Sequence, residues 1–374
     1  MQVSDLGSWG IGSEKPLIMA GPCSAETEDQ LFETAKALKE INISIIRAGI
    51  WKPRTRPNNF EGVGIEGLRW AQRVKKELGV KIAIEVATPA HVFEALKHNI
   101  DIIWIGARST ANPFTVQEIA NALRGMDIPV FIKNPVNPDL SLWLGAIERI
   151  ANAGITKIGA IHRGFSSFQK NKYRNAPVWQ IPLELKSKFP QMPMICDPSH
   201  ISGVRDWIFE VSQRALDLDY DGLIIESHRD PEHAWSDAAQ QLTPESLGEM
   251  LTRLKIRKST SENPEFIDRL EDLRDQIDNI DREIFEAVAA RMRIVDKIGY
   301  YKKANNVTVF QVNRWKEISD VRKQWAKALN LNEEFMEEFF KLIHDASIRR
   351  QTAIINSEDA GKNGVMESQK TDAR

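Results

Sequence analysis

The chain of 374 residues is long enough for two domains, or for one barrel-sized domain with an appendage. Charged residues make up 27% of it, hydrophobic residues 42%, and the formal net charge is -2. This balance gives no overall field that would attract nucleic acid or an anionic membrane, so we expect neither partner.

The sequence also indicates a cytoplasmic location. Two cysteines are too few for a disulfide framework, which fits a reducing compartment. The first 16 residues lack the basic and apolar segments of a signal peptide. No apolar run approaches the roughly 18 residues that a membrane helix needs.

Up to about residue 256 the chain repeats one unit, a short β-branched run followed by a polar loop and an amphipathic stretch. The apolar runs cover residues 17–21, 43–49, 81–87, 101–107, 129–134, 157–162, 192–197 and 222–227. Near-continuous apolar strands that alternate with helices predict a parallel sheet covered on both faces. Eight such units are the count of a closed (β/α)8 barrel, an α/β fold. An open doubly wound sheet is the alternative, but the sequence has no GxGxxG motif, and we predict the barrel.

Beyond the barrel, the pattern predicts a separate helical domain. We expect a barrel over 1–256, a linker over 257–264, a helical domain over 265–356 and a disordered tail over 357–374. The first helix (265–304) carries a heptad pattern, and further helices follow at about 311–329 and 332–355. The apolar positions of the heptads are Leu270, Ile277, Ile284 and Ile298 on one seam, and Leu273, Ile280, Ala287, Ile294 and Tyr301 on the other. A helix of 40 residues is about 60 Å long, more than a small monomeric bundle covers, so we expect a homodimer.

Residues with metal-binding chemistry follow the predicted strands at their carboxyl ends, where such barrels carry their active sites. They are Cys23, His200, Glu226 and Asp237. This mixed sulfur, nitrogen and oxygen set suits one first-row divalent metal ion (Mn²⁺, Fe²⁺, Co²⁺ or Zn²⁺), and the thiolate argues against Mg²⁺. Cys196, which lies inside the seventh run, is predicted to be a core residue.

Five cations follow the same strand ends: Arg47, Lys52, Arg108, Lys133 and Arg163. A single Arg or Lys in a barrel loop is commonly just solvated. Five that converge on one mouth require anions, and phosphate together with carboxylate is the combination that we predict.

These residues resemble the metal-dependent 3-deoxy-D-arabino-heptulosonate 7-phosphate (DAHP) synthases, in particular the short subgroup without an N-terminal regulatory domain. The matching segments, in the family's order, are "AGPCS", "RAGIWKPRTRP", "GARS", "IKN", "HRG", "DPSH" and the pair Glu226 and Asp237. The resemblance implies the four metal ligands above. It assigns the five cations to phosphoenolpyruvate, and Lys52, Pro53, Arg54 and Thr55 to erythrose 4-phosphate, with Lys52 as the candidate proton donor. Sister enzymes that use arabinose 5-phosphate lack "KPRT", and a synthase for another sugar phosphate remains the alternative.

The helical domain contains a second group of polar residues. Arg291 interrupts the apolar seam; Arg274 and Lys302 flank it, and Arg314, Ser347 and Gln351 lie on the later helices. Cations that face the interior of a small bundle indicate an anionic ligand. A single polar residue in such a seam can also simply fix the register of a coiled coil.

The spacing Arg274, Arg291, Lys302 and the segment "SIRRQ" resemble the all-helical chorismate mutases. The resemblance implies that the arginines bind the two carboxylates of chorismate, and that Lys302 and Gln351 bond the breaking ether oxygen. Gln311 and Trp315 stand where that family commonly has Asp and Glu. The alternative is a domain that only dimerises and senses chorismate or prephenate. Whether the domain is a mutase or only a sensor, we expect feedback control of the barrel. Chorismate or prephenate bound by the helical domain would favour a state in which this domain docks on the barrel and restricts its mouth.

Overall fold

The computed structural model describes the chain except for residues 13–14, 53–59, 169–171, 259 and 358–374, and except for the side chains of 312–317 and 319–320. The chain divides into two compact units, Met1–Ser259 and Thr260–Arg374. The tail expected over 357–374 lies, apart from residue 357, outside the described residues.

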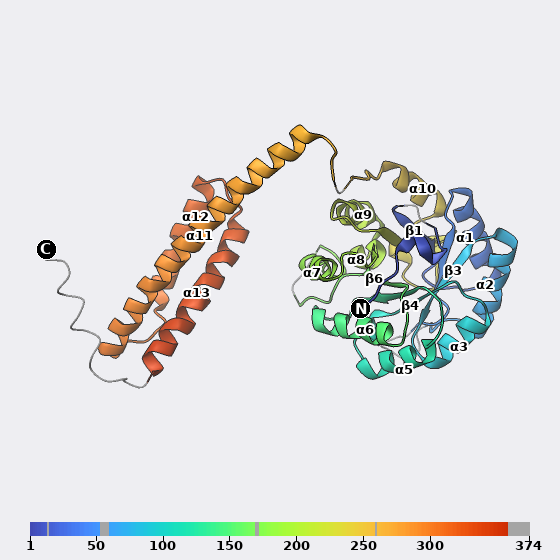
Figure 1. The fold of residues 1–374 in the computed structure, drawn as a ribbon, viewed down its shortest axis with the longest axis horizontal. Helices are drawn as coiled ribbons and strands as arrows, with labels where there is room; N and C mark the ends of the chain where they lie inside the picture. Colours follow the sequence, from blue (N-terminus) through green and yellow to red (C-terminus); the bar gives the residue numbers. More distant parts are fainter. Residues whose placement is uncertain (13–14, 53–59, 169–171, 259, 358–374) are drawn as a thin grey trace. The chain divides into compact units, whose positions relative to one another are not determined.

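The first unit is a closed barrel of eight parallel strands in sequential order, as predicted (Figure 1). The strands are β1 (Leu17–Gly21), β2 (Ile45–Ala48), β3 (Lys81–Val86), β4 (Ile102–Ile105), β5 (Val130–Lys133), β6 (Ile158–His162), β7 (Met194–Cys196) and β8 (Gly222–Glu226). β1 pairs with β8 along its whole length, with Gly21 opposite Glu226, and this pairing closes the barrel. Seven of the strands are one to three residues shorter than the apolar runs, because the runs also include mostly buried residues of the flanking loops.

Helices follow the strands and form the outer ring (Figure 1). They are α1 (Glu28–Glu40), α2 (Ile65–Leu78), α3 (Pro89–Lys97), α4 (Ala107–Thr110), α5 (Pro113–Leu123), α6 (Leu140–Asn152), α7 (Gln180–Lys188), α8 (Pro198–Ser202), α9 (Ile208–Asp217) and α10 (Pro244–Arg253). Local sequence sets their starts: the Thr27 side chain accepts from the Gln30 amide at α1, and Thr243 forms a capping box with Ser246 at α10.

The amino-terminal segment closes one end of the barrel. The 3-10 helix η1 (Leu6–Trp9) contributes Leu6 and Trp9 to the cluster inside the strands, and the Trp9 ring lies 5.4 Å from that of Phe131. A larger core, which includes Cys196, lies between the strands and the helices. Because η1 packs into the interior, the polar residues at the carboxyl ends of the strands remain the place for a ligand.

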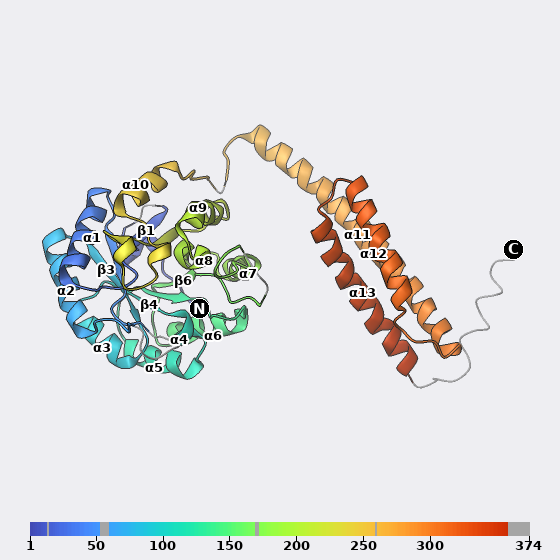
Figure 2. The ribbon, with the colours of Figure 1, turned by 180° about the vertical axis from the view of Figure 1, so that it is seen from behind.

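The described residues of the second unit form three helices, as predicted: α11 (Pro264–Ala304), α12 (Val312–Ala328) and α13 (Glu333–Asn356). α11 has 41 residues and starts at the Asn263 cap. α13 packs against both α11 and α12, while the first turns of α11 extend beyond the other two (Figures 1 and 2). Apolar seam residues of α11 such as Ile277 and Ile280 are exposed in the single chain. Among the described residues, no helix is long and apolar enough to cross a membrane.

Candidate active site

The strand ends bring the predicted barrel residues to one mouth. Glu226 and Lys133 are the last residues of β8 and β5, Arg47 lies in β2, and Arg163 directly follows β6. Cys23 lies two residues beyond β1. Gly49 permits the close approach of the first two loops, because a Cβ there would collide with the carbonyl of Cys23.

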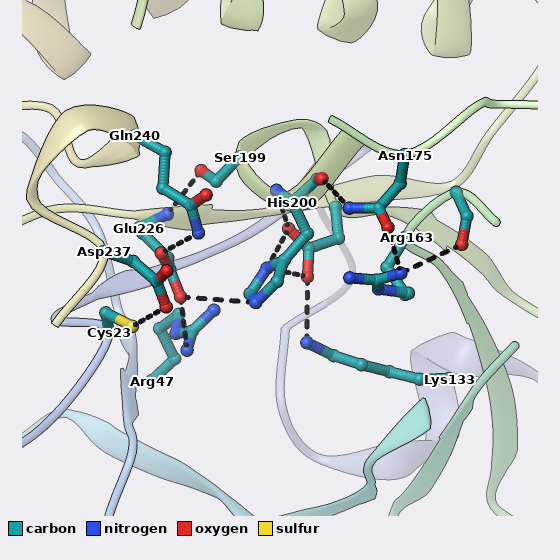
Figure 3. Close-up of polar contacts among 12 residues, drawn as sticks. Cys23, Arg47, Lys133, Arg163, Asn175, Ser199, His200, Glu226, Asp237 and Gln240 are labelled. Atoms are coloured by element: carbon teal, nitrogen blue, oxygen red, sulfur yellow. Dashed lines mark hydrogen bonds and ion pairs between the residues drawn. The ribbon is translucent and has the colours of Figure 1, made fainter. Parts of the chain in front are cut away.

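Cys23 contacts two other site residues. Lys52 Nζ donates to its Sγ at 2.8 Å, and the thiol donates to Asp237 Oδ2 at 3.3 Å (Figure 3 shows the second contact). Burial, reinforced by the charge of Glu226, raises the pKa of Cys23 to about 12 although Lys52 opposes the shift. Asp237 has a left-handed backbone (φ 47°), which Asp tolerates better than most residues. Burial alone would raise the pKa of Asp237, but the hydrogen bond and the charge of Arg174 hold it below its usual value.

His200 is oriented by a carboxylate that the sequence analysis did not select. The buried Asp197 caps α8 by accepting from the His200 amide at 3.1 Å, and Asp197 Oδ1 lies 3.0 Å from His200 Nδ1. Lys133 Nζ donates to the same carboxylate at 2.9 Å. Burial lowers the pKa of His200, so the neutral ring donates from Nδ1 and keeps a lone pair on Nε2. His200 Nε2 lies 3.8 Å from Glu226 Oε1 (Figure 3).

Arg47 is the most deeply buried cation at this mouth, at 2% exposure. Its Nη2 lies 3.2 Å from Oε1 of Glu226, and its guanidinium carbon lies 5.2 Å from the centre of the Trp104 ring. Its Nε and Nη1 atoms are buried and have no hydrogen-bond partner within the described part of the chain. Buried donors without partners are costly, which makes this guanidinium a strong candidate for binding an oxyanion through two hydrogen bonds.

The remaining cations differ in burial. Arg163 Nη1 donates to Asn175 Oδ1 at 2.8 Å, and its amide donates to Asn134 Oδ1 at 2.7 Å. Burial lowers the pKa of Arg163 to about 10, so it stays charged at neutral pH. Arg108 lies on the short helix α4 and is exposed. Pro53, Arg54 and Thr55 lie outside the described residues.

The donor set at the mouth fits a divalent metal in its chemistry. A thiol, an imidazole and two carboxylates are present, and the carboxylate of Asp197 fixes the tautomer that leaves His200 Nε2 as a ligand atom. His200 Nε2 and Glu226 Oε1 face each other as two acceptors, and within the described residues Oε1 accepts no hydrogen bond. Here the four side chains lie in contacting pairs, and no group of three His, Cys, Asp or Glu residues is gathered as a ligand set in the described part of the chain.

The helical unit brings together only some of its predicted residues. Arg291 Nη1 donates to Ser347 Oγ at 2.6 Å, and Lys302 Nζ donates to the carbonyl of Val309 at 2.5 Å. Burial lowers the pKa of Arg291 and of Lys302. Gln351 is buried, and its Oε1 has no hydrogen-bond partner among the residues described.

Arg274 does not join this group within one chain. It is exposed and lies 17 residues before Arg291, which is about 25 Å along α11. The expectation that it faces the inside of the bundle is therefore wrong for the single chain. The side chains of Arg314 and Trp315 lie outside the described residues, and Gln311 is exposed at the start of α12.

Comparison with known proteins agrees with both domains. Residues 2–262 match the model of the DAHP synthetase I family, and residues 273–352 match that of chorismate mutase type II. The chain belongs to the DAHP synthetase I family. Its fused domains make it an enzyme of the DAHP synthase and chorismate mutase types.

The barrel is similar to proteins with two different names. Phospho-2-dehydro-3-deoxyheptonate aldolase of Thermotoga maritima is 34% identical over 68% of this chain and 73% of its own length. A crystal structure of that aldolase superposes with a TM-score of 0.60 and 33% identity, covering 67% of this chain and 72% of its own. The barrel is also similar to 2-dehydro-3-deoxyphosphooctonate aldolase of Desulfotalea psychrophila, which is 30% identical over 67% of this chain and 94% of its own length.

Proposed function

We propose that the barrel condenses phosphoenolpyruvate with erythrose 4-phosphate and water, giving DAHP and inorganic phosphate. The observation that carries this proposal is the buried Arg47 guanidinium, whose Nε and Nη1 have no partner among the described residues. Lys133 and Arg163 add charge around the same mouth and support an anion with both phosphate and carboxylate groups. The similarity to a phospho-2-dehydro-3-deoxyheptonate aldolase and the "KPRT" segment favour the four-carbon aldose phosphate.

The residues of the barrel supply binding, orientation and proton transfer. Arg47, Lys133, Arg163 and Arg108 bind phosphoenolpyruvate, so that its carbon 3 is held against the aldehyde while carbon 2 stays open to water. We assign to Lys52 the donation of a proton to the oxygen that the new bond makes negative; the contact of its Nζ with the Cys23 thiol supports this role. Pro53, Arg54 and Thr55, which lie outside the described residues, are assigned to erythrose 4-phosphate by the family resemblance of the "KPRT" segment.

We infer that one divalent ion, Mn²⁺, Fe²⁺, Co²⁺ or Zn²⁺, is held by Cys23, His200, Glu226 and Asp237. When bound, such an ion supplies Lewis-acid polarisation of the aldehyde oxygen. A bound cation would also allow Cys23 to ionise, because burial raises the pKa of its thiol to about 12 and the thiolate needs a strong positive charge nearby. Glu226 Oε1 supports the same inference, because it faces His200 Nε2 at 3.8 Å and accepts no hydrogen bond among the described residues, although it is ion-paired with Arg47.

The rate of phosphoenolpyruvate loss tests the substrate. Erythrose 4-phosphate should support turnover with Mn²⁺, and arabinose 5-phosphate should not. Preference for the five-carbon sugar would replace the proposal by the related synthase reaction, to which the phosphooctonate aldolase relatives point.

We infer that the helical domain rearranges chorismate to prephenate as a homodimer. Arg291, Lys302 and the buried Gln351 supply donors for an anionic ligand, and the pericyclic reaction needs only preorganised charge. Arg274 and the exposed seam of α11 lie away from that group, which supports completion of the site by a second copy. Chorismate loss by the full chain and by its Arg291→Ala and Arg274→Ala variants tests this role. Binding without rearrangement would favour the sensing alternative.

We also propose that chorismate or prephenate, bound at the helical domain, inhibits the synthase in the cytoplasm. The two reaction types act at the start of a route and after chorismate, so they cannot exchange an intermediate directly, and control remains the reason for their fusion. Synthase rate against prephenate in the native chain and in Arg291→Ala tests this. Equal inhibition of both proteins would locate the effect in the barrel.

A further inference from the structure

A short segment of residues 172–177, which we call the strap, lies at the barrel mouth between the start of the β6 loop and helix α8. On one side Ala176 and Phe165 exchange two main-chain hydrogen bonds of 2.8 Å. On the other side the Arg174 and Asn175 amides donate to the carbonyls of Ser202 and Ile201, at 3.2 and 3.1 Å. The strap is thus held by the backbone of both the β6 loop and helix α8.

Two neighbouring side chains of the strap, Arg174 and Asn175, contact different halves of the site: the half with the metal-ligand carboxylates and the half with the anion-binding Arg163. Arg174 Nη1 donates to Asp237 Oδ1 at 2.9 Å and to Gln240 Oε1 at 2.8 Å. Gln240 in turn donates to Glu226 Oε2 at 2.7 Å. Arg174 therefore holds the carboxylates that we assign to the metal.

Asn175 holds the anion-binding half. Its Oδ1 accepts from Arg163 at 2.8 Å, and its Nδ2 donates to the His200 carbonyl at 2.6 Å (Figure 3). Asn175 is 9% exposed, so these bonds are protected from water. A single dipeptide thus bridges Arg163 and Asp237, which are 74 residues apart in the sequence.

Further contacts fix the position of the strap. The His162 ring accepts from Tyr220 at Nδ1 (3.0 Å) and donates from Nε2 to the Pro177 carbonyl (2.7 Å). At Gly203 the backbone has φ 75°, and a Cβ there would collide with the Cβ of Arg174. The strap therefore cannot shift at Arg174 without disturbing Asn175 and the residues that both side chains hold.

We propose that Arg174 and Asn175 are positioning residues that couple the two halves of the site, so that a divalent metal ion and phosphoenolpyruvate each strengthen the binding of the other. The inference rests on the proposed function of the barrel. Each ligand favours one arrangement of the strap, and because the strap holds both the metal-ligand carboxylates and Arg163, that arrangement also favours the second ligand. Such coupling is reciprocal, and its usual size is about 5- to 150-fold in affinity.

The test is calorimetric titration of the full chain with Mn²⁺ alone, with phosphoenolpyruvate alone, and with phosphoenolpyruvate at saturating Mn²⁺. In the native chain we expect Mn²⁺ to tighten phosphoenolpyruvate binding at least fivefold. In Asn175→Ala and Arg174→Met this ratio should fall to below twofold. Asn137→Ala is the matched control, because the Asn137 amide accepts from the exposed Ser166 hydroxyl in a neighbouring loop, and it should keep the native ratio.

A ratio that stays native in folded Asn175→Ala and Arg174→Met protein would overturn the coupling, and so would a ratio near one in the native chain. Failure of the native chain to bind Mn²⁺ or phosphoenolpyruvate would instead overturn the proposed function together with the coupling. If Arg174→Met does not fold, Arg174→Lys is used instead, because it keeps the charge but not the paired contact with Asp237 and Gln240. The same ratio of phosphoenolpyruvate affinities with and without Mn²⁺ is then measured.

Discussion

Arg47→Met removes the buried guanidinium on which the proposed anion site depends. Two of its nitrogens, Nε and Nη1, have no hydrogen-bond partner among the described residues, and each would form a charge-assisted hydrogen bond to phosphoenolpyruvate. At about 1.5–3 kcal/mol each, their loss should raise the Kd for phosphoenolpyruvate by about 10²- to 10⁴-fold. The substitution also leaves Glu226, which is 0% exposed, without its ion-pair partner, and breaking such a pair costs about 3–5 kcal/mol of unfolding free energy.

Calorimetric titration with phosphoenolpyruvate, next to thermal unfolding of the same samples, separates these two effects. Arg149→Met is the matched control: Arg149 is part-buried on α6 and bonds Gln117, so its loss should leave phosphoenolpyruvate binding unchanged. Arg47→Lys keeps the charge and serves if Arg47→Met does not fold. Folded Arg47→Met protein that binds phosphoenolpyruvate within threefold of the native Kd would refute the reasoning.

Three other outcomes follow from the same geometry. Cys23→Ala should abolish Mn²⁺ binding and synthase turnover. Cys196→Ala, in the core, should cost about 1 kcal/mol of unfolding free energy and leave metal binding and turnover intact. Metal binding retained in Cys23→Ala would mean that Cys23 is wrongly assigned as a ligand. Chelation should stop DAHP formation and leave chorismate rearrangement unchanged, and joint loss would argue for one composite site. Burial holds the pKa of His162 near 3, against about 6.5 in the unfolded chain, so the unfolded state takes up a proton first as pH falls. Between pH 7 and 5 the native chain should therefore lose about 2 kcal/mol more stability than His162→Gln, and parallel losses in urea titrations would contradict this.

The barrel could be predicted because its signal is repeated and local. Eight apolar runs separated by amphipathic stretches leave few folds open, and the strand ends then gather Cys23, Glu226, Arg47 and Lys133 without further information. The helices of the second unit were predictable for the same reason, since one heptad pattern runs through α11.

Residues that act through other residues were not predictable from the pattern. Asp197 stands inside the selected segment "DPSH", but its role depends on the imidazole and ammonium groups that meet around it. Arg174 and Asn175 lie in a loop without periodicity, and only the fold brings them against Asp237 and Arg163. An Asp-Pro dipeptide directly after a strand is the one local signal that could have selected Asp197, as a helix cap.

Heptad position alone also could not show where Arg274 acts. The heptad places it near the seam of Arg291, yet seventeen residues of α11 separate them by about 25 Å. The number of copies that share a site is a property of the assembly, and the seam indicates only that α11 has apolar surface left to cover.

The product formed from two competing aldehydes tests the central claim most directly. Chelator-treated protein is given phosphoenolpyruvate with equal amounts of erythrose 4-phosphate and arabinose 5-phosphate, and the products are identified by mass before and after Mn²⁺ is added. We predict no product without the metal, and after Mn²⁺ is added the seven-carbon DAHP, with one phosphate released for each molecule. An eight-carbon product in excess, or DAHP formed at an undiminished rate without metal, would contradict it.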